Sequence, residues 1–178
     1  KKITKKIKKN CLRVLFKGHF IYMNLNSLLN HVKLYLFFIT KLPLLIFCLP
    51  TIKQLTNNCC HLHIPLTFFT KNHVKSMYFA VLMVGVDLSA GLLAMELIKQ
   101  SKKNISIIFK NTSANFLKRA EHAVRFECNE GKTIQTMINE TITTSERCNQ
   151  TLAVTGYCMK TNEPVAEFTI TLSIKYKP

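Results

Sequence analysis

Asp87 is a single carboxylate within a long apolar stretch. The residues from Met77 to Met95 read MYFAVLMVGVDLSAGLLAM, and Asp87 is the only charged residue among them. A carboxylate in such surroundings must find hydrogen-bond partners or take up a proton, because an unpaired charge is costly away from water. The same group can take a proton from water or attack a carbonyl carbon. Asp87 is therefore the first candidate for a catalytic residue.

The segment before this stretch supplies further polar candidates. Asn72 and His73 begin a polar loop, TKNHVKS, at residues 70–76. Either side chain could hold a substrate carbonyl or an attacking water, and capping of the loop is the structural alternative for both. Ser76 fits the N-cap of the following helix better than it fits a nucleophile. Tyr78 is expected at an interface.

The elements that must position these residues follow from hydrophobic periodicity. The pattern predicts helices over residues 24–42 and 77–99, with a shorter helix within 130–143. Alternation predicts strands over 59–69, 105–109, 120–128, 151–159 and 165–176, with a hairpin turn at 161–163. No βαβ repeat occurs, so we expect an α+β fold with an antiparallel sheet. A helix that is apolar all round must be buried on all sides, which predicts a sheet wrapped around one long central helix, the hotdog fold.

The charge distribution divides the chain into three parts. The formal charge is +16, but eight of the 25 Lys and Arg residues fall in residues 1–22, which contain no acid. We expect residues 1–22 to be a disordered basic tail or to lie upstream of the natural start, with a membrane-surface arm as the alternative. Residues 23–49 are expected to form an apolar helix and a strand lead-in, and residues 50–178 the main domain. Because Lys41 and Pro43 interrupt the apolar run at 34–50, a signal anchor is less favoured than a packed helix.

The seven cysteines show no CxxC pair and no regular spacing. Their odd number favours reduced thiols in a cytoplasmic protein over a disulfide framework. The cluster of Cys59, Cys60, His61 and His63 matches no standard zinc signature. We therefore expect no metal and no redox cofactor. Nucleic acid is not an expected partner, because the basic excess outside residues 1–22 suits anionic small molecules, acidic partners or a membrane surface equally well.

Three segments together resemble the hotdog thioesterases. The stretch NHVKSMYFAVLMVGVDLSAGLLAM is similar to their loop and central helix, FKNTSANFLKRAEHAVRFEC to the segment after the helix, and VAEFTITLSIKYK to the final strand. The similarity covers roughly residues 50–177 and is greatest to a little-characterised branch beside the phenylacetate-pathway and 4-hydroxybenzoyl-CoA thioesterases. The resemblance implies hydrolysis of acyl thioesters, usually acyl-CoA. It also implies a homodimer or homotetramer whose sheets join edge to edge, with active sites between subunits.

The resemblance also assigns roles to individual residues. Asp87 falls where phenylacetate-type members carry the catalytic carboxylate, and the amides of Tyr78, Phe79 and Ala80 are expected to bind the thioester oxygen at the helix start. Many relatives carry His-Gly-Gly where this chain has Tyr78-Phe79-Ala80. Asn72 and His73 are candidates for additional polar contacts.

Two further residues are expected to contact the substrate. Gly91 belongs to the small and apolar residues three, four and seven positions from Asp87, which would let a ligand or a partner backbone approach. Lys110 is expected to meet CoA phosphates, and a solvated basic edge is the alternative. The rival to the enzyme is a non-catalytic acyl-binding or assembly module on the same scaffold. A membrane-anchored protein using residues 34–50 or 77–98 is a third possibility, although membrane contact through the N-terminal segment is not favoured.

Overall fold

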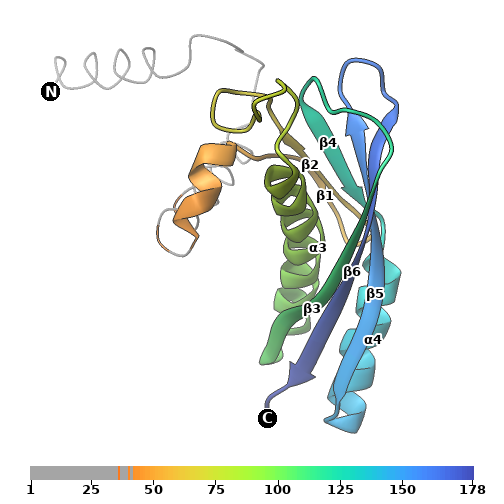
Figure 1. Ribbon diagram of the computed structural model, residues 1–178. Coiled ribbons are helices and arrows are strands. Elements are labelled where there is room, and N and C mark those ends of the chain that lie inside the picture. The colour runs from red at the N-terminus through yellow and green to blue at the C-terminus, as the bar shows by residue number, and fades with distance from the viewer. Residues whose placement is uncertain (1–35, 37–39, 41) are drawn as a thin grey trace, which may run out of the picture. The chain divides into compact units, whose positions relative to one another are not determined.

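The computed structural model describes Leu36, Thr40 and residues 42–178 (Figure 1). The expected tail at 1–22 lies outside the described residues, and so does almost all of the helix expected over 24–42. From residue 42 onward, the described element order is η1 (Pro43–Cys48), β1 (Thr51–Leu55), β2 (Cys60–Ile64), α3 (Phe79–Ser101), β3 (Ile105–Phe116), β4 (Val124–Cys128), α4 (Gly131–Thr144), β5 (Arg147–Cys158) and β6 (Pro164–Tyr176).

The six strands form one antiparallel sheet in the order β1-β2-β4-β5-β6-β3. β5 and β6 form a long hairpin, and β3 pairs along its whole length with β6. Along β6 the side chains of Phe168, Ile170, Leu172 and Ile174 are buried on one face, as the alternation in the sequence predicts. This face of the sheet covers α3, and the fold is the predicted hotdog arrangement (Figure 1).

The central helix is set close to the sheet by a glycine. A Cβ atom at Gly85 would overlap the ring of Phe126 on β4, so only glycine lets the two elements approach this closely. The Phe126 ring is fully buried and lies 6.5 Å from the ring of Phe168. By length and composition α3 could cross a membrane, but 56% of its apolar 18-residue window is buried inside the protein, where the helix packs on the sheet and α4. It is the core helix of this domain.

The shorter helix α4 is attached where β5 begins and β6 ends. Its residue Thr141 is fully buried and donates its hydroxyl hydrogen to the carbonyl of Glu146 at 2.6 Å. The same oxygen accepts the amide of Tyr176 at 3.0 Å, which ties the end of β6 to the helix. One threonine side chain therefore satisfies two backbone groups at a helix-strand junction.

Several element boundaries differ from the sequence prediction. The strand expected over 59–69 ends at Ile64, because Pro65 follows and residues 67–70 form a turn; Phe68 is exposed rather than buried. The strand expected over 120–128 begins only at Val124, and His122 before it is exposed. The lead-in before the domain is a 3-10 helix, and β3 continues seven residues beyond 109.

Candidate active site

Asp87 lies on the one face of α3 that the sheet leaves open. The expectation that this helix is buried on all sides is wrong: Asp87 is exposed, and Met83, Val84 and Gly91 beside it are only partly buried. These residues lie at helical spacing and form a surface that we call the open stripe, which consists of Ala80, Met83, Val84, Asp87, Gly91 and Met95. Ala90 and Ala94, expected on the same face, are fully buried against the domain. The helix therefore presents a carboxylate surrounded by small and apolar side chains.

The carboxylate of Asp87 has no partner within the part of the chain that the structure describes. Among the described residues it makes no hydrogen bond and no ion pair. The protein around it removes part of its hydration, and this desolvation raises the pKa of Asp87 above its ordinary value. A carboxylate that is open to one side, unpaired and more basic than usual is suited to take a proton from water.

At the start of α3, two backbone amides lack an acceptor in the described part of the chain. Tyr78 is the N-cap residue, and its amide donates to the carbonyl of Thr70 at 2.8 Å. The amide of Val81 is also used, because it donates to the carbonyl of Tyr78 at 2.9 Å. Within the described residues, the amides of Phe79 and Ala80 have no acceptor. These two groups are the available oxyanion donors at the positive end of the helix.

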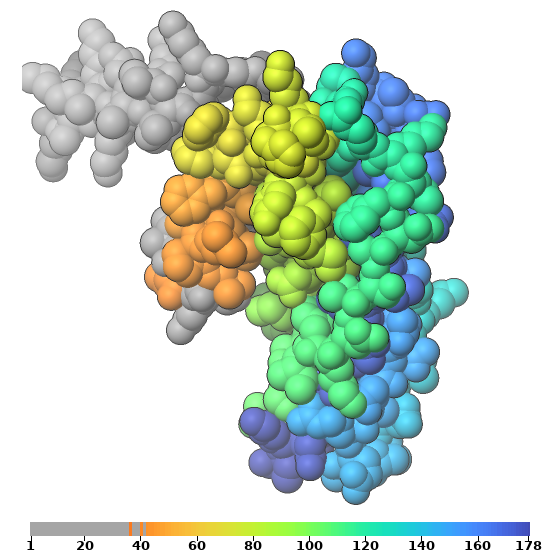
Figure 2. All heavy atoms as spheres, in the orientation of Figure 1, coloured from red at the N-terminus to blue at the C-terminus, as the bar shows by residue number. Residues whose placement is uncertain are grey.

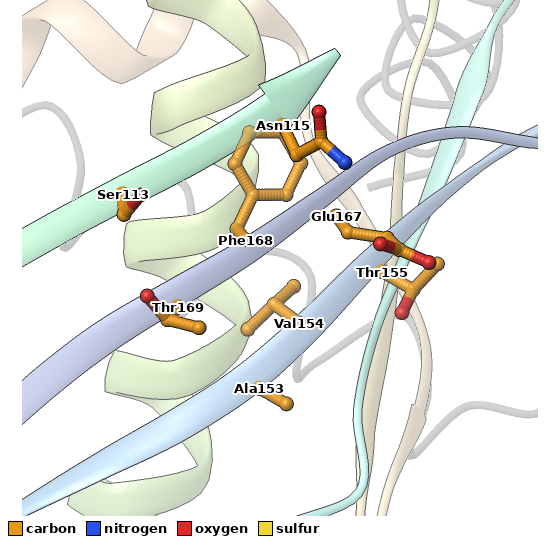
Figure 3. Close-up of a pocket in the computed structure, with 8 residues that line it drawn as sticks. All are labelled: Ser113, Asn115, Ala153, Val154, Thr155, Glu167, Phe168 and Thr169. Carbon is orange, nitrogen blue, oxygen red and sulfur yellow. The ribbon is translucent and has the colours of Figure 1, made fainter. Parts of the chain in front are cut away.

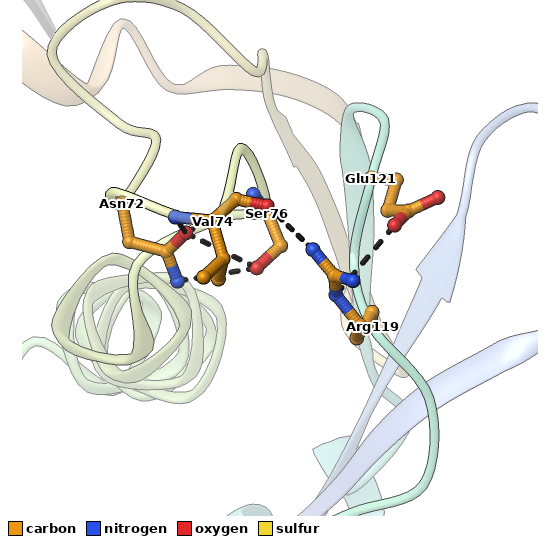
Figure 4. A network of polar contacts seen from close by, with 5 residues as sticks. All are labelled: Asn72, Val74, Ser76, Arg119 and Glu121. Atoms are coloured by element: carbon orange, nitrogen blue, oxygen red, sulfur yellow. Dashed lines mark hydrogen bonds and ion pairs between the residues drawn. The ribbon is translucent and has the colours of Figure 1, made fainter.

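The loop before the helix is held by Asn72 (Figure 4). Its side-chain oxygen accepts the amides of Val74 and Ser76, both at 3.1 Å, and its side-chain nitrogen donates to the Ser76 hydroxyl at 3.1 Å. Arg119 reaches the same loop and donates to the carbonyl of Val74. The polar atoms of Asn72 are therefore engaged in capping the loop, the structural alternative for this residue.

Other expected site residues lie in varied settings. Ser76 is not the N-cap of α3, because its buried hydroxyl is bonded to Asn72 and Tyr78 occupies that position without a side-chain bond. His73 is exposed in the loop, and Lys110 is exposed where β3 bulges against β6. Gly91 faces the ring of Phe109, which a Cβ atom would meet at an ordinary 3.7 Å.

Thr70 has a structural role that was not predicted from the sequence. It is fully buried, accepts the amide of Thr67 at 2.7 Å and donates to the carbonyl of Pro65 at 2.7 Å. Because its own carbonyl receives the amide of Tyr78, Thr70 also determines which amides at the helix start remain unpaired. The paired threonines of the sequence TFFT at 67–70 are the signal that could have indicated this turn.

The strand β3 leaves one edge of the sheet open beside Asp87. It is the last strand in the sheet order and pairs only with β6 within the described residues. It packs near the open stripe, since Phe109 approaches Gly91. A long edge strand with unpaired backbone groups readily pairs with another strand.

A separate hollow lies on the outer face of the sheet, away from α3 (Figure 3). It has a volume of about 390 Å³ and is lined by Ser113, Asn115, Ala153, Val154, Thr155, Glu167, Phe168 and Thr169. Ala153, Thr155, Glu167 and Thr169 alternate with buried residues on β5 and β6 and therefore point outward, and Ser113 and Asn115 of β3 pair with Thr169 and Glu167. The hollow contains none of the candidate catalytic residues.

Comparison with known proteins identifies relatives by sequence family and by fold. A family model described as a domain of unknown function (DUF4442) matches residues 32–174. No curated protein matches the chain. A solved structure from Pseudomonas aeruginosa, described as a probable thioesterase, is 18% identical, with a TM-score of 0.68 over 82% of this chain and 96% of that one. A thioesterase from Haemophilus influenzae is 12% identical, with a TM-score of 0.61 over 79% and 88%. The thioesterase SAV0944 of Staphylococcus aureus, solved as a mutant, is 13% identical, with a TM-score of 0.58 over 75% and 98%.

Proposed function

The chain belongs to the DUF4442 family and has the hotdog fold, and from this premise we propose that it hydrolyses acyl thioesters, with acyl-CoA as the substrate class. The observation that carries the proposal is the water-accessible carboxylate of Asp87 on the open stripe of the central helix, which no described residue pairs. The solved thioesterases of the same fold support the choice of reaction.

The proposed reaction uses Asp87 as a general base. Its carboxylate takes a proton from water while the water oxygen attacks the thioester carbonyl carbon. The carbonyl oxygen becomes an oxyanion, which the amides of Phe79 and Ala80 stabilise. Collapse of this intermediate breaks the carbon–sulfur bond, and the thiolate leaves and takes up a proton. The raised pKa of Asp87 makes its carboxylate a stronger base for the first step.

The site requires a second copy of the chain. Asp87 lies seven to eight residues from the helix start, a distance of about 10 to 12 Å along the axis at 1.5 Å per residue. Both groups cannot contact one thioester within a single subunit. A homodimer in which two β3 edges pair antiparallel about a twofold axis would set the two α3 helices antiparallel. The helix start of one subunit would then approach Asp87 of the other.

Substitution of Asp87 tests the chemistry. In a steady-state assay of the full chain against acyl-CoA substrates of varied acyl groups, we expect Asp87→Asn and Asp87→Ala to lower kcat by roughly 10²–10⁴-fold. The matched control is Glu96→Gln, which neutralises the other carboxylate on the same helix, where it accepts a bond from Gln100 at 3.1 Å. Full activity in Asp87→Asn would exclude the proposed base. Binding of acyl-CoA without turnover by the wild-type chain would instead favour an acyl-binding module.

Mixing two inactive variants tests the shared site. Phe79→Pro removes one oxyanion donor at the first helical position, where proline is tolerated and the extended backbone of Tyr78 suits a following proline. Phe79→Ala controls for the loss of the ring. If Asp87 and the amide come from different subunits, random mixing of Asp87→Asn with Phe79→Pro restores about one quarter of wild-type activity, because half of the dimers are mixed and each contains one intact site. No recovery in confirmed mixed dimers would place both groups in one subunit and refute the arrangement.

A further inference from the structure

Four exposed apolar side chains gather where η1 meets the turn before the central helix. We call Leu44, Phe47, Phe68 and Phe69 the aromatic cap; their exposed fractions are 69%, 54%, 78% and 63%. The Phe47 and Phe69 rings lie 5.5 Å apart, and those of Phe68 and Phe69 lie 5.6 Å apart. Figure 2 shows the two segments, orange and yellow, adjoining on one face. The three phenylalanine rings therefore form one contiguous surface, and Leu44 lies three residues before Phe47 on η1.

The two rings at 68 and 69 are carried by a hydrogen-bonded turn of the backbone. They are the central residues of a turn that closes with the Thr70 amide donating to the carbonyl of Thr67 at 3.3 Å. The buried hydroxyl of Thr70 fixes the turn from inside through its bonds to residues 65 and 67. These bonds hold the backbone that carries Phe68 and Phe69. The rings project from a fixed corner.

Only cations accompany the cap in its stretch of sequence. Residues 43–86 supply all four cap side chains and contain Lys53, Lys71 and Lys75 but no Asp or Glu. The Lys71 ammonium group lies 5.9 Å from the centre of the Phe68 ring. Protruding aromatic rings beside lysines, with no acid nearby in sequence, are the combination that inserts at the headgroup level of an anionic bilayer.

We propose that the aromatic cap docks the protein on an anionic lipid surface, with Phe68 and Phe69 inserted among the headgroups and Lys71 against lipid phosphates. A protruding corner needs no matching groove, which favours a bilayer over a folded protein partner as the occupant. The amide of Tyr78 is bonded to Thr70, so the docked cap is attached directly to the start of α3. Docking is independent of the proposed hydrolysis and would also hold for a protein that only binds acyl groups.

The chain contains no tryptophan, so one substitution provides a unique fluorescent reporter. We expect Phe69→Trp in the full chain to show blue-shifted emission, and quenching by brominated lipid, on phosphatidylcholine vesicles that contain phosphatidylglycerol. Neutral phosphatidylcholine vesicles should give a much smaller change. Met159→Trp, at another exposed apolar position in the β5–β6 hairpin, is the control and should remain unquenched.

Removal of the rings gives the second measurement. Phe68→Ser with Phe69→Ser should lower the vesicle partition coefficient by roughly tenfold or more, while Leu117→Ser with Met159→Ser should not. Circular dichroism would confirm that each variant is folded. Vesicle binding without quenching at position 69 would overturn the proposal and assign binding to the basic N-terminal residues. Blue-shifted emission of Phe69→Trp in the absence of vesicles would also overturn the proposal. If that shift depends on protein concentration, a second copy of the chain covers the cap; if it does not, the chain's own N-terminal segment covers it.

Discussion

The contact of Gly85 with Phe126 is expected to control how the central helix is seated on the sheet. A methyl group at position 85 would overlap the Cζ and both Cε atoms of the fully buried ring. Overpacking of this kind costs about 1–3 kcal/mol, and the better helix propensity of alanine returns about 1 kcal/mol. Gly91→Ala is the matched control on the same helix, because its new methyl group would meet the Phe109 ring at 3.7 Å. Gly91→Ala should therefore be neutral or stabilising.

Urea unfolding followed by circular dichroism, at one protein concentration for all variants, measures the difference. We expect Gly85→Ala to be less stable than Gly91→Ala by about 1–3 kcal/mol, which isolates the clash because both variants gain the same helix propensity. Phe126→Leu removes the far end of the ring, so Gly85→Ala should cost less in that background. If Gly85→Ala is as stable as Gly91→Ala, or if the two substitutions at 85 and 126 act additively, the close approach does not determine the packing.

Three further results are expected. The pKa of Asp87 is raised in the folded chain, so protonation of this carboxylate favours the folded state. This contribution is complete below the unfolded pKa near 3.8 and is lost as pH rises through the folded pKa. Asp87→Asn should therefore raise Tm at pH 7 relative to wild type, with a smaller gain at pH 3. Thr141→Val keeps the volume but leaves the Glu146 carbonyl and the Tyr176 amide unpaired, which should cost about 1–3 kcal/mol in urea unfolding. Asn72→Ala removes the bonds that close the loop and should also lower Tm, whereas His73→Ala, at an exposed loop residue, should not.

Alternation in the sequence predicted strands correctly where the core covers one face of the strand, and it was unreliable where no such cover exists. Alternation along residues 165–176 is reproduced in β6 because one side of this strand packs on the core. The same alternation continues past Ile64 to Leu66 and Phe68, but Pro65 ends the strand and Phe68 projects outward. Periodicity alone does not distinguish a buried row of side chains from apolar residues on a protruding turn. The polar half of β3 was missed for the opposite reason, since its pairing with β6 depends on a neighbour distant in sequence.

The site was predictable in its central residue and not in its surroundings. Asp87 could be identified because a lone charge in an apolar helix needs an explanation, but the sequence could not show which face of the helix stays open. The open stripe carries no amphipathic signal, since Met83, Val84, Gly91 and Met95 on it are no more polar than the buried side. An apolar face that the subunit itself leaves open is expected where another surface completes the structure. The same uniform hydrophobicity that led to the wrong prediction of complete burial therefore supports the proposal that a second subunit covers this face and completes the site around Asp87.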